Sequence, residues 1–276
     1  MTLTSSDGST GYILGHSSEE LERLNEQARL IGPFSRRFFE EAGVATGMRV
    51  LDVGCGAGDV SLLARELVGP AGQVIGFDRS EAGVVTARSR ANAQGFGNVS
   101  YHVGDPSELI FESPFDAVIG RYILMFQPDP AAMLRRLSKQ VRSGGVVVFH
   151  EVNCDDARSF PAIKTYDQCW RWLVSAMRGA DTSLGTKFPE VFLKAGLPAP
   201  KMRLEALIGG GAESTKPIEL IVGLISTLLP EIERMGIATG AEIDIATLAS
   251  RMQKEAVERS AVLIGRSEIS AWCRVP

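Results

Sequence analysis

The chain has 276 residues, of which 45% are hydrophobic and 22% are charged, and its formal net charge is −4. This balance is typical of a globular protein with a substantial core and excludes a disordered chain. No run of lysines or arginines is present, so nucleic acid is not expected as a partner. The four cysteines lack any CxxC pair, which predicts neither a zinc site nor a disulfide framework and fits reduced thiols in a cytoplasmic protein.

The first residues are polar and rich in serine, threonine and glycine. We predict a disordered tail over 1–11, without a signal sequence, and no membrane span in the chain. Cap helices are predicted over 12–46. The stretch SSEELERLNEQARLI has an apolar face and is expected to end at Pro33, and a second short helix is expected from Phe34 to Ala42.

From Met48 onward, short apolar runs alternate with helical stretches. The predicted strands are MRVLDV, QVIGFD, VSYHV, FDAVIGR and GVVVFH. Strands that alternate with helices are typical of an α/β fold, in which helices pack on the faces of a parallel sheet. We predict that this core spans 47–210 and 266–276.

After Glu151 the pattern loosens. KMRLEALI is a predicted strand, and 211–265 is predicted to be a helical lid insertion within the same fold. Its helices are expected to break around Pro230 and again over 236–240, before a final strand EISAWCRV. The same helices offer a surface on which a homodimer could form.

The stretch VLDVGCGAGDV holds three glycines at alternate positions directly after the first predicted strand. Because Gly54, Gly56 and Gly58 lack Cβ atoms, the backbone can turn sharply there and approach a ligand closely. The first strand–helix turn of an α/β sheet is the usual cradle for a phosphate or a cofactor. The dinucleotide fingerprint is GxGxxG, so GxGxG followed by Asp59 favours a ligand that carries an ammonium and a sulfonium group.

Charged residues follow the predicted strands at the same edge of the sheet. Asp52 precedes the first glycine of the loop by two positions, and Asp78, followed by Arg79, ends the second strand. A carboxylate at that strand end can accept hydrogen bonds from both hydroxyls of a ribose, as it also does in nicotinamide enzymes. Asp105, at the end of the third strand, could accept from an adenine amino group, and Arg121, at the end of the fourth, could pair with a ligand carboxylate.

Taken together, VLDVGCGAGDV, VIGFDRS, VGDP, FDAVIGRYILMF and VRSGGVVVFHE closely resemble the class I S-adenosylmethionine (SAM)-dependent methyltransferases. The resemblance covers 48–151. YILGHSSEELERL resembles the N-terminal helices of a bacterial group that includes quinone-methylating and natural-product enzymes. The family implies an α/β, Rossmann-like, doubly wound sheet of seven strands, mostly parallel, with an antiparallel last strand, and it implies SAM as the cofactor.

The resemblance also implies roles for single residues. The glycines would line the methionine portion of SAM, Asp78 would hold the ribose, Asp105 and Pro106 would contact the adenine, and Arg121 would open the substrate-facing strand end. The predicted cofactor site consists of Asp52, Gly54, Gly56, Gly58, Asp78, Arg79, Asp105, Pro106 and Arg121.

Methyl transfer from a sulfonium is an in-line displacement, so the protein mainly has to align the acceptor with the methyl group. If the acceptor is a hydroxyl, a base helps to remove its proton. His150 and Glu151, at the end of the fifth predicted strand, and His16, in the N-terminal segment, are the catalytic candidates. Oxygen-bearing residues occur over 153–156, but Arg121 stands where a metal-dependent site would need an acidic residue, so no metal is predicted.

The sequence therefore predicts a SAM-dependent methyltransferase that acts on a small, largely apolar acceptor, with O-methylation of a hydroxyl favoured. C-methylation of a quinone precursor is the alternative within this class. Two alternatives from other classes stay open: an NAD-dependent oxidoreductase, and a protein that binds the cofactor without transferring its methyl group.

Overall fold

The computed structural model describes residues 18–276, with side chains described from residue 29 onward. The predicted tail over 1–11 and the candidate base His16 lie outside the described residues. Among the helices that are described, none is both long and apolar enough to cross a membrane.

Helix α1 (Ser18–Ala42) runs through Pro33 without interruption, so the prediction of two cap helices separated by this proline is wrong. A proline inside a helix removes one backbone hydrogen bond and usually ends the helix. Here the proline is exposed, while Ile31, Phe34 and Phe38 on either side of it are buried in the core. The packing of these side chains offsets the lost hydrogen bond.

Seven strands form the main sheet, in the order β3-β2-β1-β4-β5-β10-β7. The parallel strands are β1 (Arg49–Val53), β2 (Gln73–Asp78), β3 (Val99–Val103), β4 (Phe115–Arg121) and β5 (Val141–Asn153). Strand β10 (Ser267–Arg274) lies antiparallel between β5 and β7 (Lys201–Glu205). The predicted seven-stranded, mostly parallel Rossmann-like sheet with an antiparallel last strand is confirmed.

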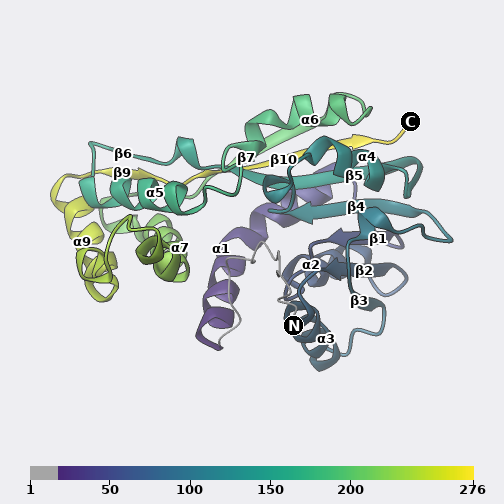
Figure 1. Cartoon of the computed structure of the whole chain (residues 1–276), viewed down its shortest axis with the longest axis horizontal. Coiled ribbons are helices and arrows are strands. Elements are labelled where there is room, and N and C mark those ends of the chain that lie inside the picture. The colour runs from purple at the N-terminus through teal and green to yellow at the C-terminus, as the bar shows by residue number, and fades with distance from the viewer. Residues whose placement is uncertain (1–17) are drawn as a thin grey trace, which may run out of the picture.

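Apolar strands and the helices between them explain this sheet. Val50, Val118 and Val147, on three neighbouring strands, are fully buried, as expected for strands covered on both faces. The helices that cover the sheet are α2 (Asp59–Val68), α3 (Glu81–Ala93), α4 (Pro130–Ser138) and α6 (Phe188–Lys194) (Figure 1). Because β1, β2 and β4 are parallel, the connections that follow them lie at the same edge of the sheet, where the strands end.

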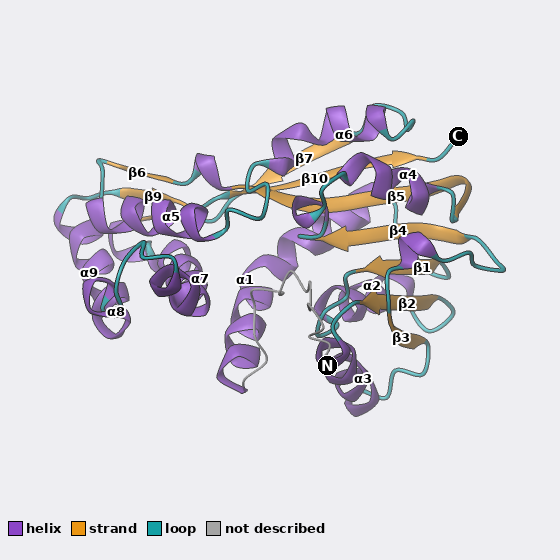
Figure 2. Cartoon of the chain, viewed as in Figure 1, coloured by secondary structure: helices purple, strands orange, loops and turns teal. Residues whose placement is uncertain are grey.

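A second group of elements, which we call the outer lobe, lies at the other end of the long axis (Figure 2). Its helices are α5 (Lys164–Ala176), α7 (Thr215–Arg234), α8 (Gly240–Ile243) and α9 (Ile245–Glu258). They pack with a three-stranded sheet of β6 (Arg158–Phe160), β9 (Val262–Ile264) and β8 (Ile208–Gly210). Because β6 follows β5 and β9 precedes β10 along the chain, these strands join the lobe to the main sheet.

The outer lobe differs from its prediction in two respects. The small sheet was not predicted, because strands of three residues are too short to display an alternating pattern. Helix α7 also continues through Pro230, where the sequence predicted a break. Ile218, Ile221 and Ile225 form a buried stripe along this helix, while the proline is exposed. As in α1, burial of an apolar face outweighs the effect of one proline.

Candidate active site

The glycine loop connects β1 to α2 at the carboxyl end of the parallel strands. Gly54 and Gly56 have positive φ angles of 69° and 49°, which side-chain-bearing residues adopt only under strain. A Cβ atom at Gly54 would collide with the side chain of Ile123, whereas one at Gly56 would meet nothing within 4 Å. Gly54 thus permits close packing inside the protein, and Gly56 leaves open space beside the loop.

Asp78, at the end of β2, fixes the glycine loop. Its Oδ2 accepts a hydrogen bond from the backbone N–H of Gly56 at 2.8 Å, and its Oδ1 accepts one from the N–H of Ser80 at 2.7 Å. The residue keeps 9% of its surface exposed. Because each carboxylate oxygen has two lone pairs, Asp78 can hold the loop and still accept hydrogen bonds from a ligand.

Asp105 and Arg79 form a pair beyond the ends of β2 and β3. Arg79 Nη2 donates to Asp105 Oδ2 at 2.6 Å, and the N–H of Ser107 donates to Asp105 Oδ1 at 2.9 Å. Burial tends to raise the pKa of Asp105, but these hydrogen bonds and the charge of Arg79 hold it below its usual value. Arg79 therefore orients Asp105, and Pro106 begins the short 3-10 turn that follows (Pro106–Glu108).

Asp52 lies in β1 and is fully buried. Ser61, in the first turn of α2, donates a hydrogen bond to its Oδ2, while its Oδ1 has no partner among the described residues. Burial raises the pKa of Asp52 to about 7. The structure thus places Asp52 where it joins β1 to α2 under the glycine loop.

Asp59 begins α2 and forms an ion pair with Arg90 at 2.7 Å. In the sequence, this carboxylate after the glycines favours a positively charged ligand over a diphosphate. Because Arg90 neutralises it, the residue contributes little to that argument. The case against a dinucleotide therefore depends on the GxGxG spacing of the loop.

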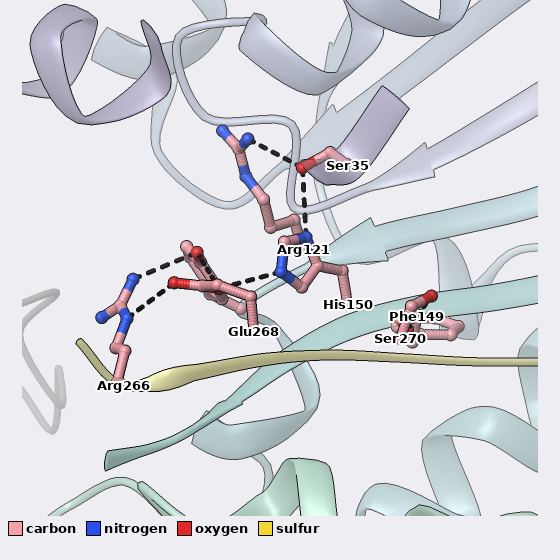
Figure 3. Close-up of polar contacts among 8 residues, drawn as sticks. Ser35, Arg121, Phe149, His150, Arg266, Glu268 and Ser270 are labelled. Atoms are coloured by element: carbon pink, nitrogen blue, oxygen red, sulfur yellow. Dashed lines mark hydrogen bonds and ion pairs between the residues drawn. The ribbon is translucent and has the colours of Figure 1, made fainter. Parts of the chain in front are cut away.

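A buried polar network lies beside the end of β4 (Figure 3). Arg121 Nη1 donates to Ser35 Oγ of α1 at 3.2 Å, and Ser35 Oγ lies 3.1 Å from His150 Nδ1. His150 Nε2 lies 2.8 Å from Glu268 Oε2, and Arg266 Nε donates to Glu268 Oε1 at 2.9 Å. The network joins α1, β4, β5 and β10.

The protonation states of these groups determine which atoms of the network donate hydrogen bonds and which accept them. Burial lowers the pKa of His150, so the ring is neutral. Burial would raise the pKa of Glu268, but the charge of Arg266 and the hydrogen bond from His150 lower it to about 2. Glu268 is thus an ionised acceptor, so His150 carries its proton on Nε2 and accepts from Ser35 on Nδ1.

The two described base candidates are both fully buried. His150 belongs to the network above, and Glu151 Oε1 accepts hydrogen bonds from the backbone N–H groups of Ile123 at 2.9 Å and Leu124 at 2.7 Å. Burial raises the pKa of Glu151 to about 8. The Glu151 side chain supports the turn after β4, and the His150 side chain joins Ser35 to Glu268. Their catalytic role stays a prediction.

Sequence reasoning missed Ser35, Arg266 and Glu268. Ser35 lies in α1, Arg266 directly precedes β10, and Glu268 lies at the start of β10. No motif connects segments that lie more than 200 residues apart in the chain. One signal was available: Glu268 is a charged residue at the start of an otherwise buried strand, and a buried charge needs a partner.

The region 153–156 is occupied by local contacts. Asn153 Oδ1 accepts from the N–H of Asp155 at 3.3 Å, and Asp156 Oδ2 accepts from Ser267 Oγ at 2.6 Å. Among the side chains described from residue 29 onward, no group of three or more His, Cys, Asp and Glu residues is arranged to hold a metal ion.

A Rossmann-like sheet with a glycine loop after its first strand, and acidic residues after its second and third, defines a cofactor-binding α/β protein. Solved structures agree with the fold. A putative methyltransferase from Bacillus halodurans superposes with a TM-score of 0.56 at 18% identity, covering 88% of this chain and 98% of that one.

Comparison of sequences identifies the family. The model of the methyltransferase domain matches residues 45–195. The 2-phytyl-1,4-naphtoquinone methyltransferase of Synechococcus elongatus is 31% identical over 189 residues, which are 67% of this chain and 79% of that protein. Aklanonic acid methyltransferase DauC of Streptomyces sp. is 35% identical over 134 residues, 48% of this chain and 60% of that protein. The chain belongs to the methyltransferase-domain family and is a SAM-dependent methyltransferase.

Proposed function

We propose that this enzyme binds SAM at the glycine loop and transfers its methyl group to a small, largely apolar acceptor that carries oxygen on a ring. The observation that carries the cofactor assignment is the open space at Gly56, whose backbone N–H donates to the Asp78 carboxylate. A side chain at Gly56 would fill this space, and Asp78 is the group that the family uses for the ribose. When bound, SAM supplies an electrophilic methyl group on a sulfonium.

The residues present fit this cofactor. Asp78 and Asp105 provide carboxylate oxygens as acceptors for hydroxyl and amino donors, and both are held in place by backbone N–H groups. Arg121, held by Ser35, provides a cation at the end of β4 for a carboxylate. Arg79 orients Asp105 through a direct hydrogen bond, and Asp52 joins β1 to α2 below the loop through Ser61.

The proposed class of acceptor is supported by the names of two relatives and by the net charge of the chain. One relative is named for 2-phytyl-1,4-naphtoquinone and the other for aklanonic acid, and the former matches two thirds of this chain. The net charge of −4 disfavours a nucleic acid acceptor. A homodimer through the helices of 211–265 and a cytoplasmic location stay predictions.

The choice between oxygen and carbon depends on how the acceptor loses its proton. A protein base would assist O-methylation of a hydroxyl, but burial removes His150 and Glu151 from solvent. An acidic ring hydroxyl ionises without a protein base, and it activates the ring carbon beside it as well as its own oxygen. C-methylation of a quinone precursor is therefore supported as well as O-methylation, which could still use His16.

Calorimetric titration with SAM, S-adenosylhomocysteine and NADH tests the cofactor. We expect micromolar binding of both adenosyl ligands and none of NADH; binding of NADH alone would overturn the proposal. Incubation with SAM and either a naphthohydroquinone or a phenolic acceptor, followed by mass spectrometry of the product, then tests the chemistry. Fragmentation separates a methyl ether from a ring methyl group, and SAM binding without any product would leave a cofactor-binding protein.

A further inference from the structure

Tyr122, the residue that follows β4, has an unusual backbone conformation. Its φ angle is 58°, in the left-handed region that bulky side chains rarely adopt and that glycine or asparagine adopts readily. Such strain persists only where surrounding contacts enforce it, and it gathers at functional sites. The turn geometry alone would not favour a tyrosine here, so the side chain must supply something else.

The phenol of Tyr122 is anchored in the buried network. Its Oη donates to Glu268 Oε2 at 2.6 Å and accepts from Arg266 Nη2 at 3.0 Å. Its backbone N–H donates to the carbonyl oxygen of His150 at 2.9 Å. Burial raises the pKa of Tyr122, so the phenol keeps its proton and remains a donor. Three hydrogen bonds therefore enforce the strained conformation.

The residue that follows Tyr122 makes the contact with the glycine loop. Ile123 comes next, and its side chain lies so close to Gly54 that a Cβ there would collide with it. The N–H groups of Ile123 and Leu124 are bound by Glu151. The turn over 121–124 is thus held by Glu268 through the phenol and by Glu151 through the backbone, and it packs against the glycine loop.

We propose that Tyr122 is a positioning residue for the cofactor cradle, and that its anchored phenol holds Ile123 against Gly54 so that the glycine loop keeps its shape for SAM. The identity of the ligand rests on the proposed function, while the support of the loop does not. Glycine or asparagine at this position would suit the backbone but could not reach Glu268.

The test compares Tyr122→Phe with a matched control, Tyr166→Phe. Tyr166 in α5 is fully buried, whereas Tyr122 is partly buried, and Tyr166 Oη donates to the carbonyl oxygen of Ile264 at 3.0 Å, within the outer lobe. Each variant loses one hydrogen-bonded phenol hydroxyl. We expect the Kd for S-adenosylhomocysteine to rise about tenfold in Tyr122→Phe and to stay unchanged in Tyr166→Phe, at similar losses of Tm.

Hydrogen exchange of the unliganded protein provides a readout that does not need the ligand. Backbone amides over 54–58 and 122–124 should exchange faster in Tyr122→Phe than in the wild type, and Tyr166→Phe should leave them unchanged. Unchanged exchange over 54–58 overturns the proposal. If the wild type bound no adenosyl ligand, the proposed function would fail, and exchange alone would still decide the role of Tyr122.

Should Tyr122→Phe fold poorly, Tyr122→Gly relieves the backbone strain while removing the anchor. We expect this variant to fold and to show the same faster exchange over 54–58. Wild-type exchange in a folded Tyr122→Gly protein would contradict the proposal.

Discussion

The main sheet and the outer lobe build their cores in different ways. In the main sheet, buried apolar strands end in polar residues, so Asp78, Asp105 and Arg121, from separate parts of the chain, lie at the same edge. In the outer lobe, α7 and α9 each bury one apolar stripe against neighbouring helices. The comparison teaches that strand ends gather chemical groups, whereas helix faces contribute mainly stability.

The largest expected effect is on cofactor binding in the main sheet. In Gly56→Val, the side chain would fill the open space beside the loop and would be strained at φ 49°. We expect the Kd for SAM to rise at least about 1,000-fold, as measured by calorimetry. Gly236→Val is the matched control, because this glycine, just after α7, has φ 64° and open surroundings. Equal SAM affinity in Gly56→Val and wild type would refute the loop assignment.

In the outer lobe we expect a loss of stability without a loss of binding. Ile225 in α7 is fully buried, and Ile225→Ala leaves a cavity that lowers the free energy of unfolding by about 3 kcal/mol. Urea unfolding measures the loss, and calorimetry should give an unchanged Kd for SAM. A large rise of that Kd would show that the lobe shapes the cofactor site and would weaken the contrast between the regions.

A smaller effect, on kcat, is expected when the network that joins α1 to the sheet is disrupted. His150→Ala removes a donor to Glu268 and an acceptor from Ser35, and should lower kcat about tenfold with little change in the Kd for SAM. In His150→Gln, an amide can supply both hydrogen bonds, so most activity should return if the ring only positions its neighbours. If His150 is the base, glutamine will be as inactive as alanine.

A more gradual effect concerns the pH dependence of stability. The pKa of Asp52 is raised from 3.8 to about 7 in the folded chain, so the folded state holds a proton that the unfolded chain releases as the pH rises between these values. The free energy of unfolding should therefore fall with rising pH across this window, by at most about 1.4 kcal/mol per pH unit from this group.

Asp52→Asn removes that contribution and should flatten the curve of unfolding free energy between pH 5 and pH 7, measured in urea. Glu151, with its pKa raised to about 8, adds a slope of the same sign that the variant retains. Parallel curves for the variant and the wild type would contradict the assignment of a buried, protonated Asp52.

Prediction from sequence succeeded where neighbouring residues in the chain determine the local structure. The strands over 73–78, 99–103 and 115–121 agree with β2, β3 and β4 to the residue, because short runs rich in β-branched and aromatic residues, bounded by turn residues, are typical of strands. It failed at Pro33 and Pro230, where local propensity predicts a helix end and burial of neighbouring isoleucines and phenylalanines decides otherwise. It also missed the three-residue strands, whose pairing depends on partners far along the chain.

The sequence by itself determined the fold, the glycine loop and the family, because each follows from spacing within short segments. Only the tertiary structure decided how the polar residues are used. It buried His150 and Glu151, paired Asp59 with Arg90, and joined Tyr122 to Glu268. These outcomes depend on burial and on contacts between residues as far as 146 positions apart. A buried charge or phenol takes its role from its partners, and those partners are set by packing.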